Sequence, residues 1–137
     1  MEISTGNSLQ EKLYRISTKY RHCWYKLMDY LKMKNDGRVC GVGGLIGTGK
    51  TTMMLQAILE INQFDKCLLL ECDREDNLQE ICDIINLYQN CKYVFIDNFT
   101  WVSGIGACSV LADRYAYEGR KIVLTGDELQ LFRLLEA

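Results

Sequence analysis

The stretch that decides the fold is residues 38–52, which read RVCGVGGLIGTGKTT. Its first residues are short-chained and apolar and predict a buried strand, and its last residues begin a helix. Between them Gly44 and Gly49 flank four residues and Lys50-Thr51 follows, which completes the GxxxxGK[ST] pattern of a P-loop. Main-chain N–H groups of such a loop, together with the helix N-terminus, bind phosphate oxygens. The sequence therefore predicts a phosphate-binding loop between a strand and a helix.

The position of each residue in this pattern predicts its contact with a nucleoside triphosphate. Lys50 is placed to reach the β- and γ-phosphates, and Thr51 to offer its hydroxyl to Mg²⁺. Thr52 lies one residue further into the helix and is a weaker candidate, for the α-phosphate. The predicted phosphate-binding residues are Gly44, Leu45, Ile46, Gly47, Thr48, Gly49, Lys50, Thr51 and Thr52. The alternative is a glycine-rich turn that only joins a strand to a helix.

A second apolar strand ends in an acid, because residues 93–97 read YVFID. Parallel strands bring their carboxyl ends to one edge of a sheet, so Asp97 is expected beside the P-loop, where it would hold Mg²⁺ through the water shell of the ion. The alternative is a solvent-exposed acid at a strand end. Asn98 follows, and an amide can orient a water molecule but cannot take its proton, which predicts slow hydrolysis at best. Asp127 and Glu128 are weaker candidates for the missing base.

A third apolar strand ends in a hydroxyl residue. Residues 122–126 read IVLTG, and Thr125 is a candidate to contact the γ-phosphate or the attacking water. The alternative is an ordinary turn at the end of a strand. Lys50, Asp97, Asn98 and Thr125 together make up the predicted catalytic set.

Strands and helices alternate along the chain after the P-loop. Apolar runs predict strands at 66–72, 92–97 and 121–125, and helical spacing of apolar residues predicts helices between them and a final short helix at 127–136. Each strand is a continuous apolar run, which is typical of a parallel sheet covered on both faces. The predicted fold is therefore a three-layer α/β fold of the P-loop NTPase type.

An N-terminal helix precedes this core. Ser8 and Glu11 match a capping box, and apolar residues at helical spacing predict one long amphipathic helix over about 9–33. The predicted domain organisation is an N-terminal segment, 1–37, and a P-loop NTPase core, 38–137. The aromatic residues of this helix, Tyr20, Trp24 and Tyr25, would either pack in the core or border the adenine.

Composition indicates one soluble domain. The chain has 137 residues and a net charge of −2, so it carries no basic field that would attract nucleic acid or an anionic membrane. Its seven cysteines are odd in number and form no CxxC pair, which favours free thiols in a reducing compartment. The sequence contains neither a signal peptide nor an apolar run long enough to span a bilayer, and a cytoplasmic location is expected.

Three segments, GVGGLIGTGKTT, KYVFIDNFTW and KIVLTGDEL, resemble in their order and spacing the prokaryotic AAA-type ATPases of the AAA+ superfamily. The resemblance implies a sheet in the order 5-1-4-3-2, ATP as the nucleotide, Thr125 as the sensor residue, and often assembly or action through a fused partner domain. Asn98 stands where this family carries its catalytic glutamate. The sequence ends at Ala137, before the fifth strand and the helical lid, so the resemblance assigns no arginine finger among Arg114, Arg120 and Arg133.

A missing fifth strand would leave the P-loop strand at a sheet edge. Unpaired N–H and C=O groups there favour pairing with another chain, so self-association or a protein partner is expected at this edge. The alternative is that the long N-terminal helix covers the edge. Two functions are compatible with the sequence. One is an ATPase core whose hydrolysis is slow or depends on a partner, and the other is a nucleotide-binding module without turnover.

Overall fold

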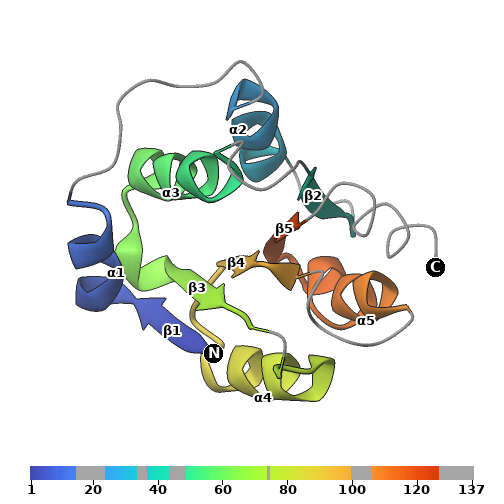
Figure 1. Cartoon of the computed structure of the whole chain (residues 1–137). Helices are drawn as coiled ribbons and strands as arrows, with labels where there is room; N and C mark the ends of the chain where they lie inside the picture. Colours follow the sequence, from blue (N-terminus) through green and yellow to red (C-terminus); the bar gives the residue numbers. More distant parts are fainter. Residues whose placement is uncertain (15–23, 34–36, 44–48, 74, 100–105, 127–137) are drawn as a thin grey trace.

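A five-stranded sheet forms the centre of the molecule (Figure 1). The computed structural model describes residues 1–14, 24–33, 37–43, 49–73, 75–99 and 106–126. The strands are β1 (Glu2–Thr5), β2 (Val39–Gly43), β3 (Cys67–Glu71), β4 (Tyr93–Asp97) and β5 (Lys121–Gly126), and their order in the sheet is β1-β3-β4-β5-β2. Strands β2 to β5 run parallel, whereas β1 runs antiparallel to β3.

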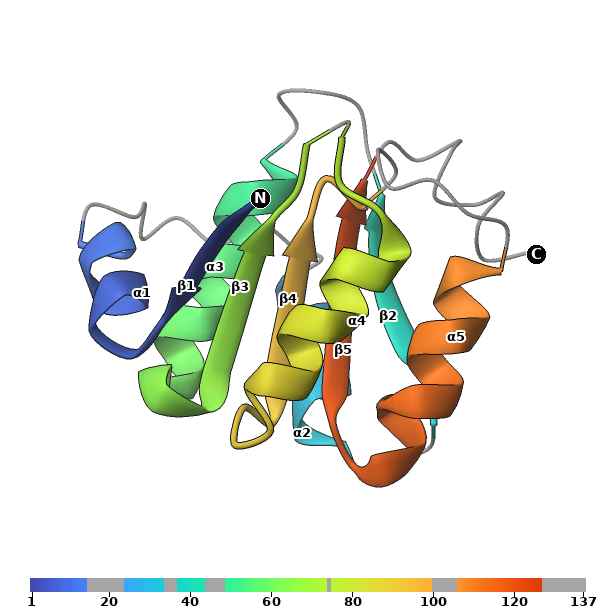
Figure 2. The ribbon, with the colours of Figure 1, turned by 90° about the horizontal axis from the view of Figure 1, so that it is seen from below.

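Helices lie on both faces of the sheet. The α-helices are α1 (Gly6–Lys12), α2 (Trp24–Lys32), α3 (Lys50–Ile61), α4 (Leu78–Leu87) and α5 (Ala107–Arg114), with short 3₁₀ turns η1 (Phe64–Lys66) and η3 (Ala116–Glu118). Figures 1 and 2 show α2 and α3 against one face and α4 and α5 against the other. The predicted α/β class is confirmed, while the sheet, predicted to be parallel, is only mostly so because β1 runs antiparallel.

Each face of the sheet has its own apolar core, because successive strand residues point to opposite faces. In β3, Leu68 and Leu70 belong to the core beneath α4 and α5, while Leu69 belongs to the core beneath α2 and α3. All three side chains are buried. Burial on both faces explains why this strand is apolar at consecutive positions rather than at alternate ones.

The N-terminal segment differs from its prediction, since it begins with a strand and its helix is interrupted. Helix α1 ends at Lys12 and is followed by a turn at residues 13 and 14, so the prediction of a single helix over 9–33 is wrong. Residues 15–23 lie outside the described part of the chain, and the description resumes with α2 at Trp24. Helix α1 also starts earlier than the predicted capping box of Ser8 and Glu11. Its N-cap is Thr5, whose N–H donates to Ser8 Oγ at 3.1 Å.

Strand β1 is held to β3 by a charge arrangement that a sequence pattern does not reveal. Glu2 lies directly opposite Glu71, and like charges in this position destabilise a sheet. The ammonium of Lys12, from α1, lies 2.8 Å from Glu2 Oε1 and 2.5 Å from Glu71 Oε1. One lysine therefore bridges the two carboxylates, offsets their repulsion and fixes α1 against the edge of the sheet.

Helix α2 is tied to the start of the P-loop strand. The Tyr30 hydroxyl donates to the carbonyl of Arg38 at 2.6 Å and accepts from the N–H of Ile122 at 3.2 Å, so it bridges the beginnings of β2 and β5. Of the predicted aromatic set, Trp24 packs in the core and Tyr25 is 61% exposed, while Tyr20 lies outside the described residues. Within the described residues no helix is long and apolar enough to cross a membrane.

Candidate functional site

The helix that follows the predicted P-loop begins at a glycine in an unusual backbone conformation. Gly49 has φ +86° and is the N-cap of α3, and its carbonyl accepts from the N–H of Met53 at 2.9 Å. This left-handed conformation favours glycine, which gives the second glycine of the motif a physical reason. Lys50 and Thr51 form the first turn of the helix. The predicted contacts at Gly44, Leu45, Ile46, Gly47 and Thr48 fall outside the described residues and stay predictions.

Asp97 lies at the carboxyl end of β4, directly against this helix. The Thr51 hydroxyl is 3.0 Å from each oxygen of the Asp97 carboxylate, although the two residues are 46 positions apart in sequence. The Asp97 residue is 4% exposed, so it is a buried, hydrogen-bonded group rather than an acid in solvent at a strand end. The motif that predicts a phosphate-binding loop and the motif that predicts a metal ligand therefore meet.

Thr125 completes the cluster from the neighbouring strand. Its hydroxyl donates to Asp97 Oδ1 and accepts from the backbone N–H of Asn98 at 3.1 Å. Thr125 has no exposed surface. Asn98 follows β4 with φ +59°, a left-handed conformation that asparagine adopts more readily than most residues. Thr51 and Thr125, two sequence-predicted residues, thus both lie within hydrogen-bond distance of a third, Asp97.

The oxygen atoms of this cluster fit Mg²⁺. Mg²⁺ prefers oxygen ligands, and proteins usually hold it with one or two carboxylates while phosphates and water fill the remaining positions. The cluster offers the Asp97 carboxylate and, on its exposed side, the Thr51 hydroxyl. Across the described residues there is no group of three or more His, Cys, Asp or Glu side chains that could hold a metal without such help. The donor set therefore suits a metal ion that arrives with a phosphate ligand.

Among the candidate groups that the structure describes, Arg120 does not join this cluster. Asp127, Glu128 and Arg133 lie outside the described residues. Arg120 directly precedes β5 and therefore lies at the amino ends of the parallel strands, whereas Thr125 lies near their carboxyl ends. Its guanidinium donates to the carbonyls of Cys91 and Tyr88, both at 3.0 Å. This arginine stabilises the turn after α4.

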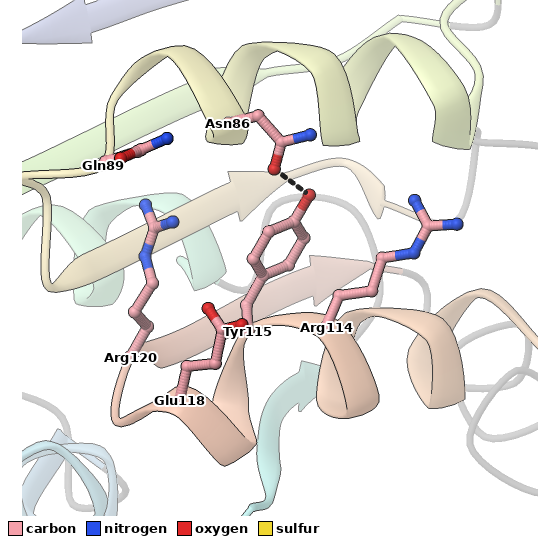
Figure 3. Close-up of a pocket in the computed structure, with 6 residues that line it drawn as sticks. All are labelled: Asn86, Gln89, Arg114, Tyr115, Glu118 and Arg120. Atoms are coloured by element: carbon pink, nitrogen blue, oxygen red, sulfur yellow. Dashed lines mark hydrogen bonds between the residues drawn. The ribbon is translucent and has the colours of Figure 1, made fainter.

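A pocket of about 610 Å³ lies beside Arg120, between the end of α4 and the α5–η3 segment. Figure 3 shows Arg114 and Arg120 on either side of Tyr115. The Tyr115 hydroxyl lies 2.8 Å from Asn86 Oδ1 and 3.2 Å from the Cys82 carbonyl oxygen, so its single hydrogen is shared between these two acceptors. Burial raises the pKa of Tyr115 to about 12, so the hydroxyl keeps its proton at neutral pH. The sequence patterns did not indicate this pocket, whose polar groups join α4 to α5 away from the Thr51–Asp97 cluster.

Comparisons with known proteins support the fold. No protein-family model matches the chain, and no curated protein sequence matches it. Among solved structures the chain is similar to C. elegans PCH-2, an AAA+ protein, with a TM-score of 0.62 and 16% sequence identity over 93% of this chain and 43% of the PCH-2 chain. The chain thus spans less than half of that protein. At this identity the similarity shows an AAA+-like fold, which agrees with the resemblance of the three sequence segments.

Proposed function

We propose that this chain is an AAA-type nucleotide-binding module that binds Mg·ATP at the carboxyl edge of β2, β5 and β4. The observation that carries the proposal is the convergence of Thr51, Asp97 and Thr125, which come from three separate sequence motifs. The order β2-β5-β4-β3 is also the order that the AAA+ resemblance implies for its first four strands. The similarity to PCH-2 supports the same fold.

The proposed contacts follow from the motif and the cluster together. Lys50, in the first turn of α3, would bind the β- and γ-phosphates, and residues 44–49 would surround the phosphates with backbone N–H groups. Thr51 and Asp97 would hold Mg²⁺, with the Thr51 hydroxyl keeping its hydrogen bond to the carboxylate. When bound, Mg²⁺ supplies positive charge that neutralises the phosphate oxygens.

Hydrolysis is proposed to be slow or to depend on a partner. Asn98 occupies the position after Asp97, and its amide cannot accept a proton from water. The alternative is a module that binds nucleotide without hydrolysing it and acts through another protein. Binding is common to both functions, so the two differ only in phosphate release.

A titration with a fluorescent ATP analogue, with and without Mg²⁺, tests this proposal. Lys50→Ala should abolish binding, and Lys66→Ala, which removes an exposed lysine at η1, is the matched control and should not change it. Phosphate release measured on the same samples separates an ATPase from a binding module. A wild-type chain that binds no nucleotide would refute the proposal, as would a Lys50→Ala variant that binds like wild type.

We also propose that the β2 edge pairs with a second chain. In the described residues β2 pairs with β5 alone, and Gly41 on this strand is exposed. Edge strands without charged side chains are prone to pair with other strands, and a lysine on the edge suppresses such pairing. Gly41→Lys should therefore convert an oligomer, measured by light scattering after size-exclusion chromatography, to monomer. A wild-type chain that stays monomeric with and without Mg·ATP would refute self-association.

A further inference from the structure

The hydrogen bonds around Thr125 have a fixed direction. The backbone N–H of Asn98 can only donate, so Thr125 Oγ1 is its acceptor. A carboxylate can only accept, so the single hydrogen of the Thr125 hydroxyl goes to Asp97 Oδ1. The three groups thus form one relay, from the Asn98 N–H through the Thr125 hydroxyl to the Asp97 carboxylate.

This relay leaves Thr125 without a donor for a phosphate. Thr125 has no exposed surface, whereas Thr51, on the other side of Asp97, is exposed. To contact a γ-phosphate, the Thr125 hydroxyl would have to leave a charged acceptor, and a lost hydrogen bond to a charged group corresponds to a factor of about ten to a hundred in an equilibrium constant. The geometry therefore favours a contact with Asp97 over a contact with nucleotide.

The backbone at Asn98 makes the relay possible. The left-handed turn at φ +59° comes immediately after β4 and brings the Asn98 N–H to the neighbouring strand, at Thr125. On the carboxylate, Oδ1 accepts the hydrogen of Thr125, while the single hydrogen of the Thr51 hydroxyl is shared between Oδ1 and Oδ2, both at 3.0 Å. The relay thus fixes the orientation of the carboxylate and leaves Oδ2 as its less occupied oxygen.

We propose that Thr125 is a positioning residue, which orients the Asp97 carboxylate for Mg²⁺ and does not sense the γ-phosphate, and that the Asn98 backbone holds it in this role. This inference rests on the proposed binding of Mg·ATP. It differs from the sensor role that the family resemblance implies for Thr125, because the side chain acts through the metal ligand rather than on the nucleotide.

Two binding measurements on Thr125→Val distinguish these roles. Valine keeps the shape of threonine and removes the hydroxyl. Mg²⁺ increases the affinity for the ATP analogue, and the Mg²⁺ concentration that gives half of this increase is the Mg²⁺ requirement. In Thr125→Val this requirement should rise about tenfold, as expected for one lost hydrogen bond to a charged group. The ratio of ATP to ADP affinity measured in EDTA should stay unchanged, because no phosphate contact is lost. Thr125→Ser, which keeps the hydroxyl, should restore the Mg²⁺ requirement to near the wild-type value.

A matched control and a second variant make the test decisive. Thr5→Val removes a threonine hydroxyl that donates to the Cys67 carbonyl at 2.6 Å, away from the cluster, and should leave the Mg²⁺ requirement unchanged. If circular dichroism shows that Thr125→Val does not fold, Thr125→Cys gives the same comparison, because a thiol is a weak donor.

Each outcome supports or overturns the inference. A Thr125→Val variant that loses affinity for ATP relative to ADP in EDTA would show a phosphate contact and overturn it. A variant with a normal Mg²⁺ requirement would overturn it as well. A wild-type chain that binds no nucleotide overturns both the proposed function and this inference, whereas a wild-type chain that binds while Thr125→Val has no effect overturns only the inference.

Discussion

Replacing Asn98 with alanine is expected to lower the free energy of unfolding by about 1 kcal/mol, because alanine has no favourable way to adopt the left-handed backbone at this position. The observed φ is +59°, and the Asn98 N–H donates to Thr125 Oγ1 at 3.1 Å, so the chain cannot relax to a negative φ without losing that hydrogen bond. For a domain of this size the change corresponds to a fall in melting temperature of about 3–5 °C. Asn98→Gly, which accepts the left-handed conformation, should melt close to wild type.

Thermal unfolding followed by circular dichroism, without nucleotide, measures this series. The backbone alone predicts that the wild type and Asn98→Gly have similar melting temperatures and that Asn98→Ala melts at a lower one. Alanine and glycine variants that melt at the same temperature would refute the left-handed turn, and a more stable alanine variant would do so more strongly. Asn62, the C-cap of α3, has φ +53° and should show the same ordering away from the cluster.

Substitution of Asn98 also tests whether the chain hydrolyses ATP. Asn98→Glu places a carboxylate where the resembling ATPases carry their catalytic glutamate, and it also imposes the backbone cost of about 1 kcal/mol. Asn62→Glu is the matched control, since it makes the same substitution in the same backbone region at a distance from Asp97. If Asn98→Glu gains phosphate release and Asn62→Glu does not, the defect in hydrolysis lies at position 98. No gain, with nucleotide binding retained, would favour the non-hydrolysing module.

Three further predictions concern stability. Lys12→Met should cost about 1 kcal/mol in urea unfolding because it leaves two opposed glutamates unneutralised, and the cost should shrink in 1 M NaCl; an equal cost at high salt would contradict the charge argument. Burial raises the pKa of the Cys67 and Cys72 thiols to about 12. Unfolded thiols therefore lose protons near pH 9 while folded ones keep them, and stability should fall between pH 9 and 12 by up to about 1.4 kcal/mol per pH unit for each thiol; urea titrations in which Cys67→Ala and Cys72→Ala have the wild-type slope would refute this. Tyr115→Phe should cost about 1–2 kcal/mol, since it removes the hydroxyl bonded to Asn86, and should not change nucleotide affinity; a change in affinity would place the pocket in the function.

The candidate site could be predicted because each of its parts ends a strand or lies in the segment that follows one. The runs before Gly44, Asn98 and Gly126 are apolar, and parallel strands bring the residues at their ends to one edge whatever lies between them in sequence. The sequence therefore predicts that Thr51, Asp97 and Thr125 lie together without any knowledge of their distances, and their roles toward a nucleotide stay predictions. What it could not supply is the direction of the hydrogen bonds or the backbone angle at Asn98, which depend on how the neighbouring strands align.

The N-terminal segment shows the opposite case. Strand β1 reads EIST, which is too short and polar for an alternation pattern to identify, and it is stabilised by Lys12 from the following helix and by pairing with β3, more than sixty residues away. Helical spacing of apolar residues also continues beyond Lys12, so it hides the turn at residues 13 and 14. The strand was missed because the contacts that hold it are with a distant part of the chain.

The residue at position 98 affects both hydrolysis and the orientation of Asp97, on which the two proposed functions depend. Asparagine there removes the side chain that would activate water, yet it suits the left-handed turn whose N–H fixes Thr125 and, through it, Asp97. A glutamate at the same place would offer a base and strain the backbone that orients the metal ligand. The arrangement thus favours positioning of the Asp97 carboxylate over proton abstraction, which agrees better with the proposed binding of Mg·ATP than with rapid hydrolysis.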